Sequence, residues 1–148
     1  MLFRTLIVLM LPLFVFAEVS NIYRIGSASI SVDGTNSVDG TLFGYKRHVV
    51  NGDITFAADI NYITVESNTY GVDDTTEVML HLGIMATDSL EIYGSYGGAY
   101  ESENSGFGWG FGLVYDFSER FAVTYEYRKF DMDNYDLKSA SLGLLIGF

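Results

Sequence analysis

The sequence predicts an all-β protein, an eight-stranded antiparallel up-and-down transmembrane β-barrel that follows an N-terminal signal peptide. Three observations lead to this fold class. Hydrophobic residues make up 49% of the chain, yet beyond the first 17 residues no apolar run approaches the about 20 residues of a membrane helix. Apolar residues alternate instead with small or polar ones, which is the pattern of strands with two different faces. Turn signals separate eight such segments along the chain.

The overall composition favours strands and tight turns over helices. Aromatic residues supply 16% of the chain, glycine occurs 16 times, and the single proline is Pro12. The absence of cysteine excludes a disulfide framework and a thiolate metal site. A formal charge of −11 would repel phosphate. We therefore expect no nucleic-acid partner and no cofactor.

The first 17 residues have the layout of a secretory signal peptide. A basic start with Arg4 precedes an apolar run over residues 5–16, and the small Ala17 stands at the boundary before Glu18. This order of charge, apolar stretch and small residue is typical of a cleaved export signal. We expect two parts, a signal peptide over residues 1–17 and one barrel domain over residues 18–148.

The segments that follow have lengths that suit a tilted membrane-spanning strand. The expected strands cover about residues 21–32, 41–50, 53–65, 76–85, 90–100, 107–117, 121–128 and 139–148. Asn51-Gly52 is the strongest two-residue hairpin signal.

The connections between these segments alternate in length. Short turns are expected at 51–52, 86–89 and 118–120, and longer loops at 33–40, 66–75, 101–106 and 130–136. Short turns on one side and longer loops on the other are the outer-membrane arrangement, and an even strand number leaves both termini on the short-turn side.

The first strand is the least regular of the eight. Ala28, Ile30 and Val32 alternate with serines and are expected to form the apolar, lipid-facing side. Arg24 falls on the same parity. We therefore expect a bulge or an interfacial position at Arg24.

The last strand ends the chain with an alternating apolar face. Its expected outward residues are Ala140, Leu142, Leu144, Ile146 and Phe148. A terminal amphipathic strand ending in Phe resembles the C-terminal signature of bacterial outer-membrane barrels. The resemblance implies that Leu142, Leu144, Ile146 and Phe148 are an assembly signal for the barrel-assembly machinery.

The stretch before it strengthens this resemblance. Gly108–Phe117, the turn Ser118–Arg120 and Phe121–Arg128, followed by the terminal strand, resemble the small OmpA-like outer-membrane β-barrel family. The resemblance covers residues 107–148, and upstream only the layout agrees. The resemblance concerns the transmembrane barrel alone, and we expect no peptidoglycan-binding domain, so cell-wall anchoring is not carried over. In that family an inward glutamate on the seventh strand pairs with basic residues, and Glu126 and Arg128 match this pattern.

The small and polar residues that alternate with the apolar ones lie on the opposite face of each strand and are expected to fill the lumen. In an eight-stranded barrel the lumen is just wide enough for side chains. The expected lumen polar network is Lys46, His48, Asp59, Glu77, His81, Glu126 and Arg128. Both histidines are interpreted as hydrogen-bonding groups rather than metal ligands or catalytic residues, because neither lies on the apolar parity and no His-x-Ser pair occurs.

These observations predict an integral outer-membrane protein of a Gram-negative bacterium with a structural role in envelope integrity. We expect a closed or very narrow lumen, with passage of small solutes or ions left open. The expected partners are outer-membrane lipid and lipopolysaccharide, and the expected state is a monomer. Two alternatives stand beside this prediction. A soluble lipocalin-like carrier would turn the apolar face inward, and a lipid-modifying outer-membrane enzyme would act through His48 or His81.

Overall fold

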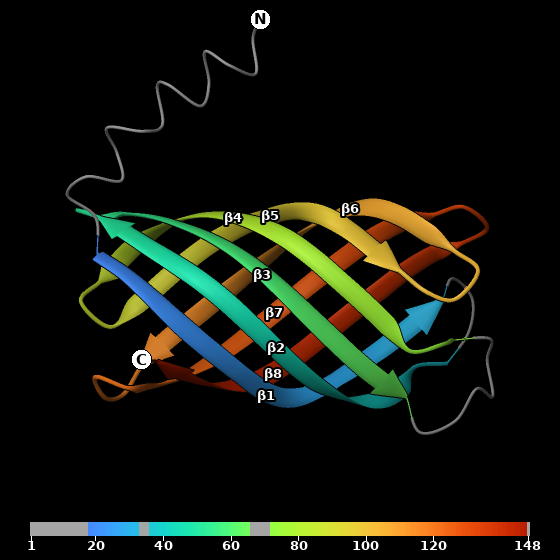
Figure 1. The fold of residues 1–148 in the computed structure, drawn as a ribbon, viewed down its shortest axis with the longest axis horizontal. Helices are drawn as coiled ribbons and strands as arrows, with labels where there is room; N and C mark the ends of the chain where they lie inside the picture. Colours follow the sequence, from blue (N-terminus) through green and yellow to red (C-terminus); the bar gives the residue numbers. More distant parts are fainter. Residues whose placement is uncertain (1–17, 33–35, 66–71, 148) are drawn as a thin grey trace, which may run out of the picture.

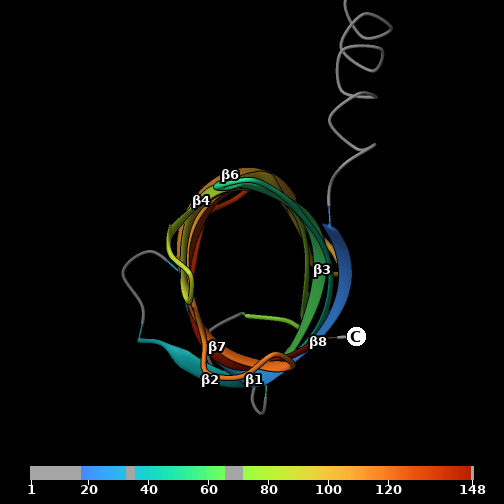
Figure 2. The ribbon, with the colours of Figure 1, turned by 90° about the vertical axis from the view of Figure 1, so that its left-hand side faces the viewer.

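The computed structural model describes residues 18–32, 36–65 and 72–147, and these form one closed β-barrel (Figure 1). The strands are β1 (Glu18–Val32), β2 (Val38–Asn51), β3 (Ile54–Val65), β4 (Thr75–Thr87), β5 (Leu90–Tyr100), β6 (Ser105–Asp116), β7 (Phe121–Met132) and β8 (Asp136–Gly147). Each strand pairs antiparallel with the next, and β8 pairs with β1 to close the ring that Figure 2 shows end on. The predicted fold class is therefore confirmed. The signal peptide expected over residues 1–17 and the terminal Phe148 lie outside the described residues.

The turn between β2 and β3 lies one residue further along the chain than the predicted Asn51-Gly52. Asn51 still belongs to β2 and pairs with Ile54, so Gly52 and Asp53 connect the strands. Gly52 has φ 62°, the left-handed conformation that this kind of hairpin requires and that a residue with a Cβ adopts at a cost.

The strands are longer and some loops shorter than expected. β7 continues to Met132 and β8 begins at Asp136, so the loop expected at 130–136 is reduced to residues 133–135. The loop expected at 101–106 is likewise reduced to 101–104. Polar side chains do not end a strand when its backbone still has a partner in the ladder, because backbone N–H and C=O groups gain from pairing whatever side chains they carry. The difference in connection length between the two ends of the barrel is therefore smaller than predicted.

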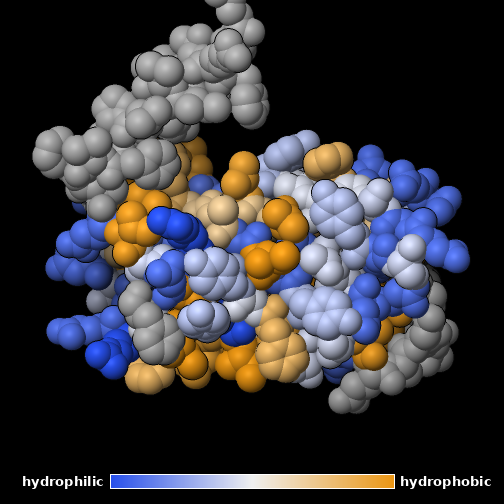
Figure 3. Space-filling model, viewed as in Figure 1, coloured by the Kyte–Doolittle hydropathy of each residue, from blue (hydrophilic) through white to orange (hydrophobic). Residues whose placement is uncertain are grey.

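The outer wall of the barrel is an apolar band. Large hydrophobic side chains project from every strand, among them Leu80, Tyr96 and Phe107, which are 66%, 62% and 63% exposed. In Figure 3 apolar and weakly polar side chains occupy the middle of the visible face, between strongly hydrophilic ends. So wide an exposed apolar surface exceeds what water-soluble monomers present. Within the described ranges no helix is long and apolar enough to cross a membrane.

The prediction for the first strand was wrong about its faces. Ala28 and Ile30 point inward and are buried, whereas Tyr23 and Ile25 point outward. Arg24 also points inward, and the pairing of β1 with both neighbours runs through it without a bulge. At this end of β1 the apolar residues of the alternating pattern therefore face the interior rather than the lipid.

This reversal extends over the loop ends of β7, β8, β1 and β2, which we call the inverted sector. Apolar residues there face the interior, and polar ones face outward. The buried inward residues are Ile30, Leu42, Phe130 and Leu137, and the exposed outward ones are Ser27, Asp39, Thr41 and Asp131. A wall with this polarity is that of a water-soluble barrel, so this sector has the surface of a part that stands outside the hydrocarbon layer.

Candidate functional site

The loop-end half of the interior is filled by apolar side chains, which we call the plug. Its members are Ala28, Ile30, Val38, Leu42, Ile63, Val72, Met79, Ala99, Phe130, Met132 and Leu137. Val72 comes from the connection before β4 and is fully buried, so a loop residue contributes to closing this end. We expected a polar, largely filled lumen; this half is filled, but by apolar side chains.

A layer of charged side chains lies next to the plug. We call it the charged belt, and its members are Arg24, Lys46, Asp59, Glu77, His81, Tyr93, Glu126 and Arg128. All are buried, with exposed fractions of 6% or less. Three cationic side chains face three carboxylates, with His81 and Tyr93 between them. This balance is what allows so many charges to be buried, because an unpaired ion in the interior is strongly unfavourable.

Arg128 joins the three carboxylates of the belt. Its Nη2 lies 2.9 Å from both Asp59 Oδ2 and Glu126 Oε2, and its Nη1 donates to Glu77 Oε2. Ser139 on β8 donates a second hydrogen bond to Glu77, at 2.9 Å. The planar guanidinium can hold several carboxylates at once because its N–H donors point in fixed directions.

Arg24 holds the other side of Glu126. Its Nη1 donates to Glu126 Oε2 and its Nη2 donates to Ser141 Oγ at 2.8 Å. The Tyr93 hydroxyl donates to Glu126 Oε1. These contacts link β1, β5, β7 and β8 across the interior. The belt therefore joins opposite walls of the barrel through side chains as well as through the sheet.

His81 connects the acidic and aromatic parts of the belt. Its Nε2 lies 3.0 Å from Asp59 Oδ2, and its ring stacks on Tyr93 with centroids 4.5 Å apart. Several buried polar atoms in and beside the belt find no hydrogen-bond partner among the described residues, among them Asp59 Oδ1, His81 Nδ1 and Thr124 Oγ1. Buried groups of this kind are usually satisfied by internal water. The belt thus has the hydrogen-bonding capacity to hold water between the strands.

Asp59, His81 and Glu126 also have the composition of a metal site. One ligand atom from each lies within 4.8 Å of the others. The Arg128 guanidinium, however, lies 2.9 Å from both carboxylates. A cation already occupies the position that a metal would take, so the geometry is that of an ion-pair cluster.

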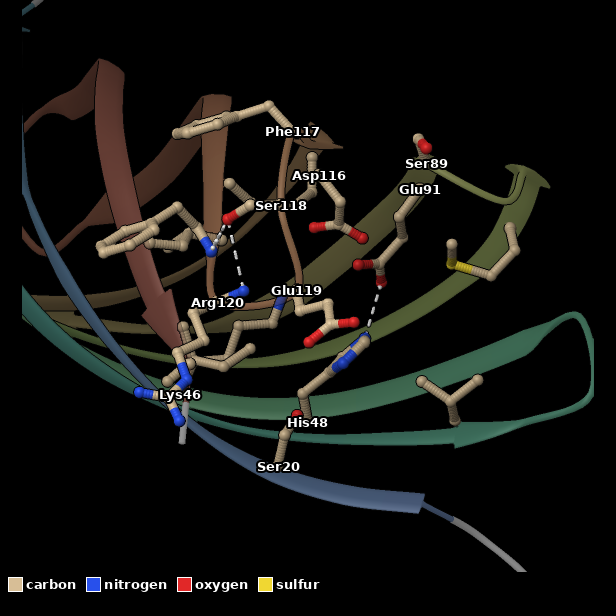
Figure 4. Close-up of a pocket in the computed structure, with 18 of the residues that line it drawn as sticks. Ser20, Lys46, His48, Ser89, Glu91, Asp116, Phe117, Ser118, Glu119 and Arg120 are labelled. Atoms are coloured by element: carbon tan, nitrogen blue, oxygen red, sulfur yellow. Dashed lines mark hydrogen bonds and ion pairs between the residues drawn. The ribbon is translucent and has the colours of Figure 1, made fainter.

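Beyond the belt the interior opens at the short-turn end into a cavity of about 990 Å³, which we call the vestibule. Its charged side carries Lys46, His48, Glu91 and Asp116. Glu91 Oε1 accepts a hydrogen bond from Thr55 at 2.6 Å. The same oxygen lies 3.3 Å from His48 Nε2 (Figure 4). The interior is therefore layered, with the plug, the charged belt and the vestibule in sequence from the loop end to the turn end.

The structure divides the predicted lumen residues between two layers. Lys46, Asp59, Glu77, His81, Glu126 and Arg128 come together in the charged belt, and Lys46 also lines the vestibule. His48 is separated from the others and pairs with Glu91. Among the described residues, neither histidine makes a hydrogen bond to a serine.

Three important residues were missed by sequence reasoning. Arg24 was expected at a bulge or an interfacial position, although a charge in the middle of an apolar face is itself a signal of an inward position. Tyr93 and Glu91 fall on the inner parity of β5 but were given no role. In β8, Leu142 is exposed on the outer wall, and Leu144 and Ile146 are partly exposed. Their function as an assembly signal stays a prediction.

A second polar cluster lies at the loop end, in the connections between strands and at the first residue of β4. Glu101 accepts hydrogen bonds from Tyr135 and, at 3.1 Å, from Thr75, and Ser102 donates to Asp73 at 2.8 Å. Burial raises the pKa of the Glu101 carboxyl above its ordinary value of 4.5, although these hydrogen bonds act in the opposite direction. Burial and the neighbouring Glu101 raise the pKa of the Tyr135 hydroxyl. The cluster joins three connections beside the plug.

Comparisons with known proteins identify the architecture. No protein-family model matches the chain, and no curated protein matches it. Among solved structures, Ail, the attachment invasion locus protein of Yersinia pestis, superposes with a TM-score of 0.69 at 16% identity, over 88% of this chain and 98% of that one. Neisserial surface protein A gives a TM-score of 0.61 at 15% identity, over 89% and 99% of the two chains.

A barrel from the de novo design of transmembrane β-barrels is also similar, with a TM-score of 0.59 and 14% identity over 87% of this chain and 95% of the design. At these identities the likeness concerns the fold. The chain has the architecture of the small eight-stranded barrels of outer membranes. Because a designed protein shares this architecture, the fold alone does not carry a biological role.

Proposed function

We propose that this chain is an integral outer-membrane β-barrel with a structural role in the envelope, and that it forms no open pore. The observation that carries the proposal is the pairing of an apolar outer band with a filled interior. The band suits contact with lipid chains, and the plug and the charged belt close the barrel in series.

The closed interior argues against a solute channel. A pore needs a continuous path that ions can enter and leave, whereas the buried side chains of the loop-end half are mostly the apolar ones of the plug. The belt beyond it holds Arg128 and three carboxylates in ion pairs rather than leaving these charges free to solvate a permeating ion. In our proposal the wild-type barrel therefore conducts no ions.

The proposal also includes a location and partners. The barrel lies in the outer membrane of a Gram-negative bacterium, and its outer band contacts membrane lipid and lipopolysaccharide. The C-terminal strand is read by the barrel-assembly machinery, with Leu142, Leu144 and Ile146 on its outer side. The barrel acts as a monomer, and no catalytic role is part of the proposal.

The soluble carrier remains the alternative that must be tested. It would require an apolar interior that accepts a ligand and a polar outer wall. The outer band instead exposes Trp109, Phe111 and Leu113 along one strand, and this observation favours lipid as the environment.

Refolding and conductance of residues 18–148 test the proposal together. The chain, unfolded in urea, is diluted into lipid vesicles, and insertion is detected as a folded band that shifts on an electrophoresis gel after heating. The same material is then added to a planar bilayer, with an open porin as the positive control. We expect insertion and a silent current trace. Steady discrete openings would replace the structural proposal with a pore, and a folded chain that stays in solution without detergent or lipid would favour the carrier.

A further inference from the structure

The vestibule has two chemically different sides. Ile22, Val114, Ala122 and Leu145 lie together as an apolar group on the walls formed by β1, β6, β7 and β8. Lys46, His48, Glu91 and Asp116 form the inner charged side, and the exposed Glu18, Asp88, Glu119 and Arg120 add further charges to the lining. Its volume of about 990 Å³ is within the range of cavities that hold small ligands. An apolar surface that faces a few converging polar groups is the usual composition of a binding site.

Lys46 places a positive charge at the inner end of this cavity, where described carboxylates interact with it electrostatically but none of them forms a direct ion pair with it. The residue is 5% exposed, and its ammonium lies 4.6 Å from the centroid of the Tyr93 ring. No described residue accepts a hydrogen bond from it or forms an ion pair with it, and it lines the vestibule. The aromatic ring compensates only part of the cost of burying an ammonium group. An anionic group in the vestibule would satisfy its three donors.

Glu91 and Asp116 supply the opposite charge nearby. The Glu91 oxygen Oε1 is engaged by Thr55 and His48, whereas no described residue donates to Oε2. The Asp116 carboxylate interacts electrostatically with Glu91, His48 and Lys46. In Figure 4 the carboxylates of Glu91 and Asp116 lie on the same side of the opening. Two neighbouring carboxylates repel each other, and a cationic group between them relieves that repulsion.

We propose that the vestibule binds a small zwitterion of the peptide class, a short peptide with free amino and carboxyl ends and apolar side chains. The carboxylate contacts the Lys46 ammonium, the ammonium contacts Glu91 and Asp116, and the side chains lie on the apolar wall. A simple anion would meet the two carboxylates, and a simple cation would meet Lys46. Only a ligand with both charges matches both groups. The inference concerns the turn end alone and does not depend on whether the barrel conducts.

The binding test uses three probes of nearly the same shape. The refolded chain of residues 18–148, labelled with ¹⁵N in detergent micelles, is titrated with leucyl-leucine, with N-acetyl-leucyl-leucine and with leucyl-leucine amide. The acetyl group removes the positive charge, and the amide removes the negative one. We expect leucyl-leucine to shift the backbone amide signals of His48 and Ala122 and to leave that of Met132, at the plug, unchanged. Each capped probe should bind about tenfold more weakly or worse, because it loses a charge-assisted interaction.

Two variants test which side chain of the vestibule contacts each charged end of the peptide. Lys46→Met should abolish the preference for leucyl-leucine over its amide, and Asp116→Asn should weaken the preference over the acetylated probe. Asp53→Asn, in the β2–β3 turn at the same end but outside the vestibule lining, is the matched control and should change neither preference. If Lys46→Met does not fold, Asp116→Asn carries the test alone.

Each other outcome overturns the proposal in a defined way. Equal binding of the amide would show a site for cations, and equal binding of the acetylated probe would show a site for anions. Shifts at Met132 as large as those at His48 would show nonspecific association. No shift with any probe would exclude a peptide site in the vestibule.

Discussion

Removing the cation at the centre of the charged belt is the sharpest test of how the interior holds together. Arg128 is 2% exposed and contacts Asp59, Glu77 and Glu126. In Arg128→Met the apolar stem is approximately kept, but three buried carboxylates lose their shared partner. Breaking a buried pair by removing one member typically costs about 3–5 kcal/mol. Proton uptake by one carboxyl limits the loss, so we expect the free energy of unfolding to fall by about 3–5 kcal/mol rather than by a multiple of it.

The assay is equilibrium unfolding by urea of the refolded barrel in lipid vesicles, followed by the heat-dependent gel shift. Lys129→Met is the matched control, because Lys129 is the next residue of β7, points outward, and has its ammonium 2.7 Å from Asp136 Oδ2 with its side chain 37% exposed. An exposed ion pair contributes about 0–1 kcal/mol. Equal losses in the two variants would refute the reasoning. Adding Glu77→Gln to Arg128→Met should recover part of the loss, since one unpaired charge is then removed.

Three further predictions address the glycines, the plug and the loop end. Gly108→Ala should impair folding because a Cβ at this position would lie 2.7 Å from Phe130 Cα. Gly94→Ala is the control and should fold normally, because Gly94 faces outward and a Cβ there would lie 3.9 Å from its nearest neighbour, the Gly110 carbonyl oxygen. The intensity of the folded gel band measures both. Phe130→Ala should lower the free energy of unfolding by about 3–5 kcal/mol, as measured by the urea assay, because the ring is fully buried in the plug. The Glu101 carboxyl, titrated by ¹³C NMR, should have a pKa above 4.5. A raised pKa means that the folded form binds the proton more tightly, so the loop-end cluster should lose stability as the pH rises through that pKa, and Glu101→Gln should lose this dependence. A titration midpoint at or below 4.5 would contradict the assignment.

Alternation along the chain was enough to predict the barrel and most of its outer wall. In β3 to β6 most large apolar side chains lie on the outer face and most small or charged ones on the inner face, with Ile63, Met79 and Tyr93 among the inward exceptions. The two faces therefore separate without knowledge of the fold. The same rule selected Asp59, Glu77, Glu126 and Arg128 as interior residues. Their partners could not be predicted, because Arg24 and Glu126 are 102 positions apart and meet only when β8 closes on β1.

The layered interior was beyond sequence reasoning for a different reason. Parity tells which side of the wall a residue faces, but it does not tell the height at which residues of different strands meet. The plug gathers residues of several strands at one height, and only the register of all the pairs defines that height. The prediction of which face of β1 meets the lipid was wrong for a related reason. The apolar residues change from the outer to the inner face along this strand, so a single assignment cannot describe it.

The inverted sector has a consequence for how this protein tolerates mutation. Along β1, the outward positions near the turn end, Tyr23 and Ile25, should accept other apolar residues and reject charges, whereas the outward position near the loop end, Ser27, should accept charges freely. The inward position Ile30 should reject them. In a saturation mutagenesis profile of this strand, the positions that tolerate charges would therefore switch from the inward to the outward face partway along. The residue at which they switch would mark, to within about two residues, where the lipid ends.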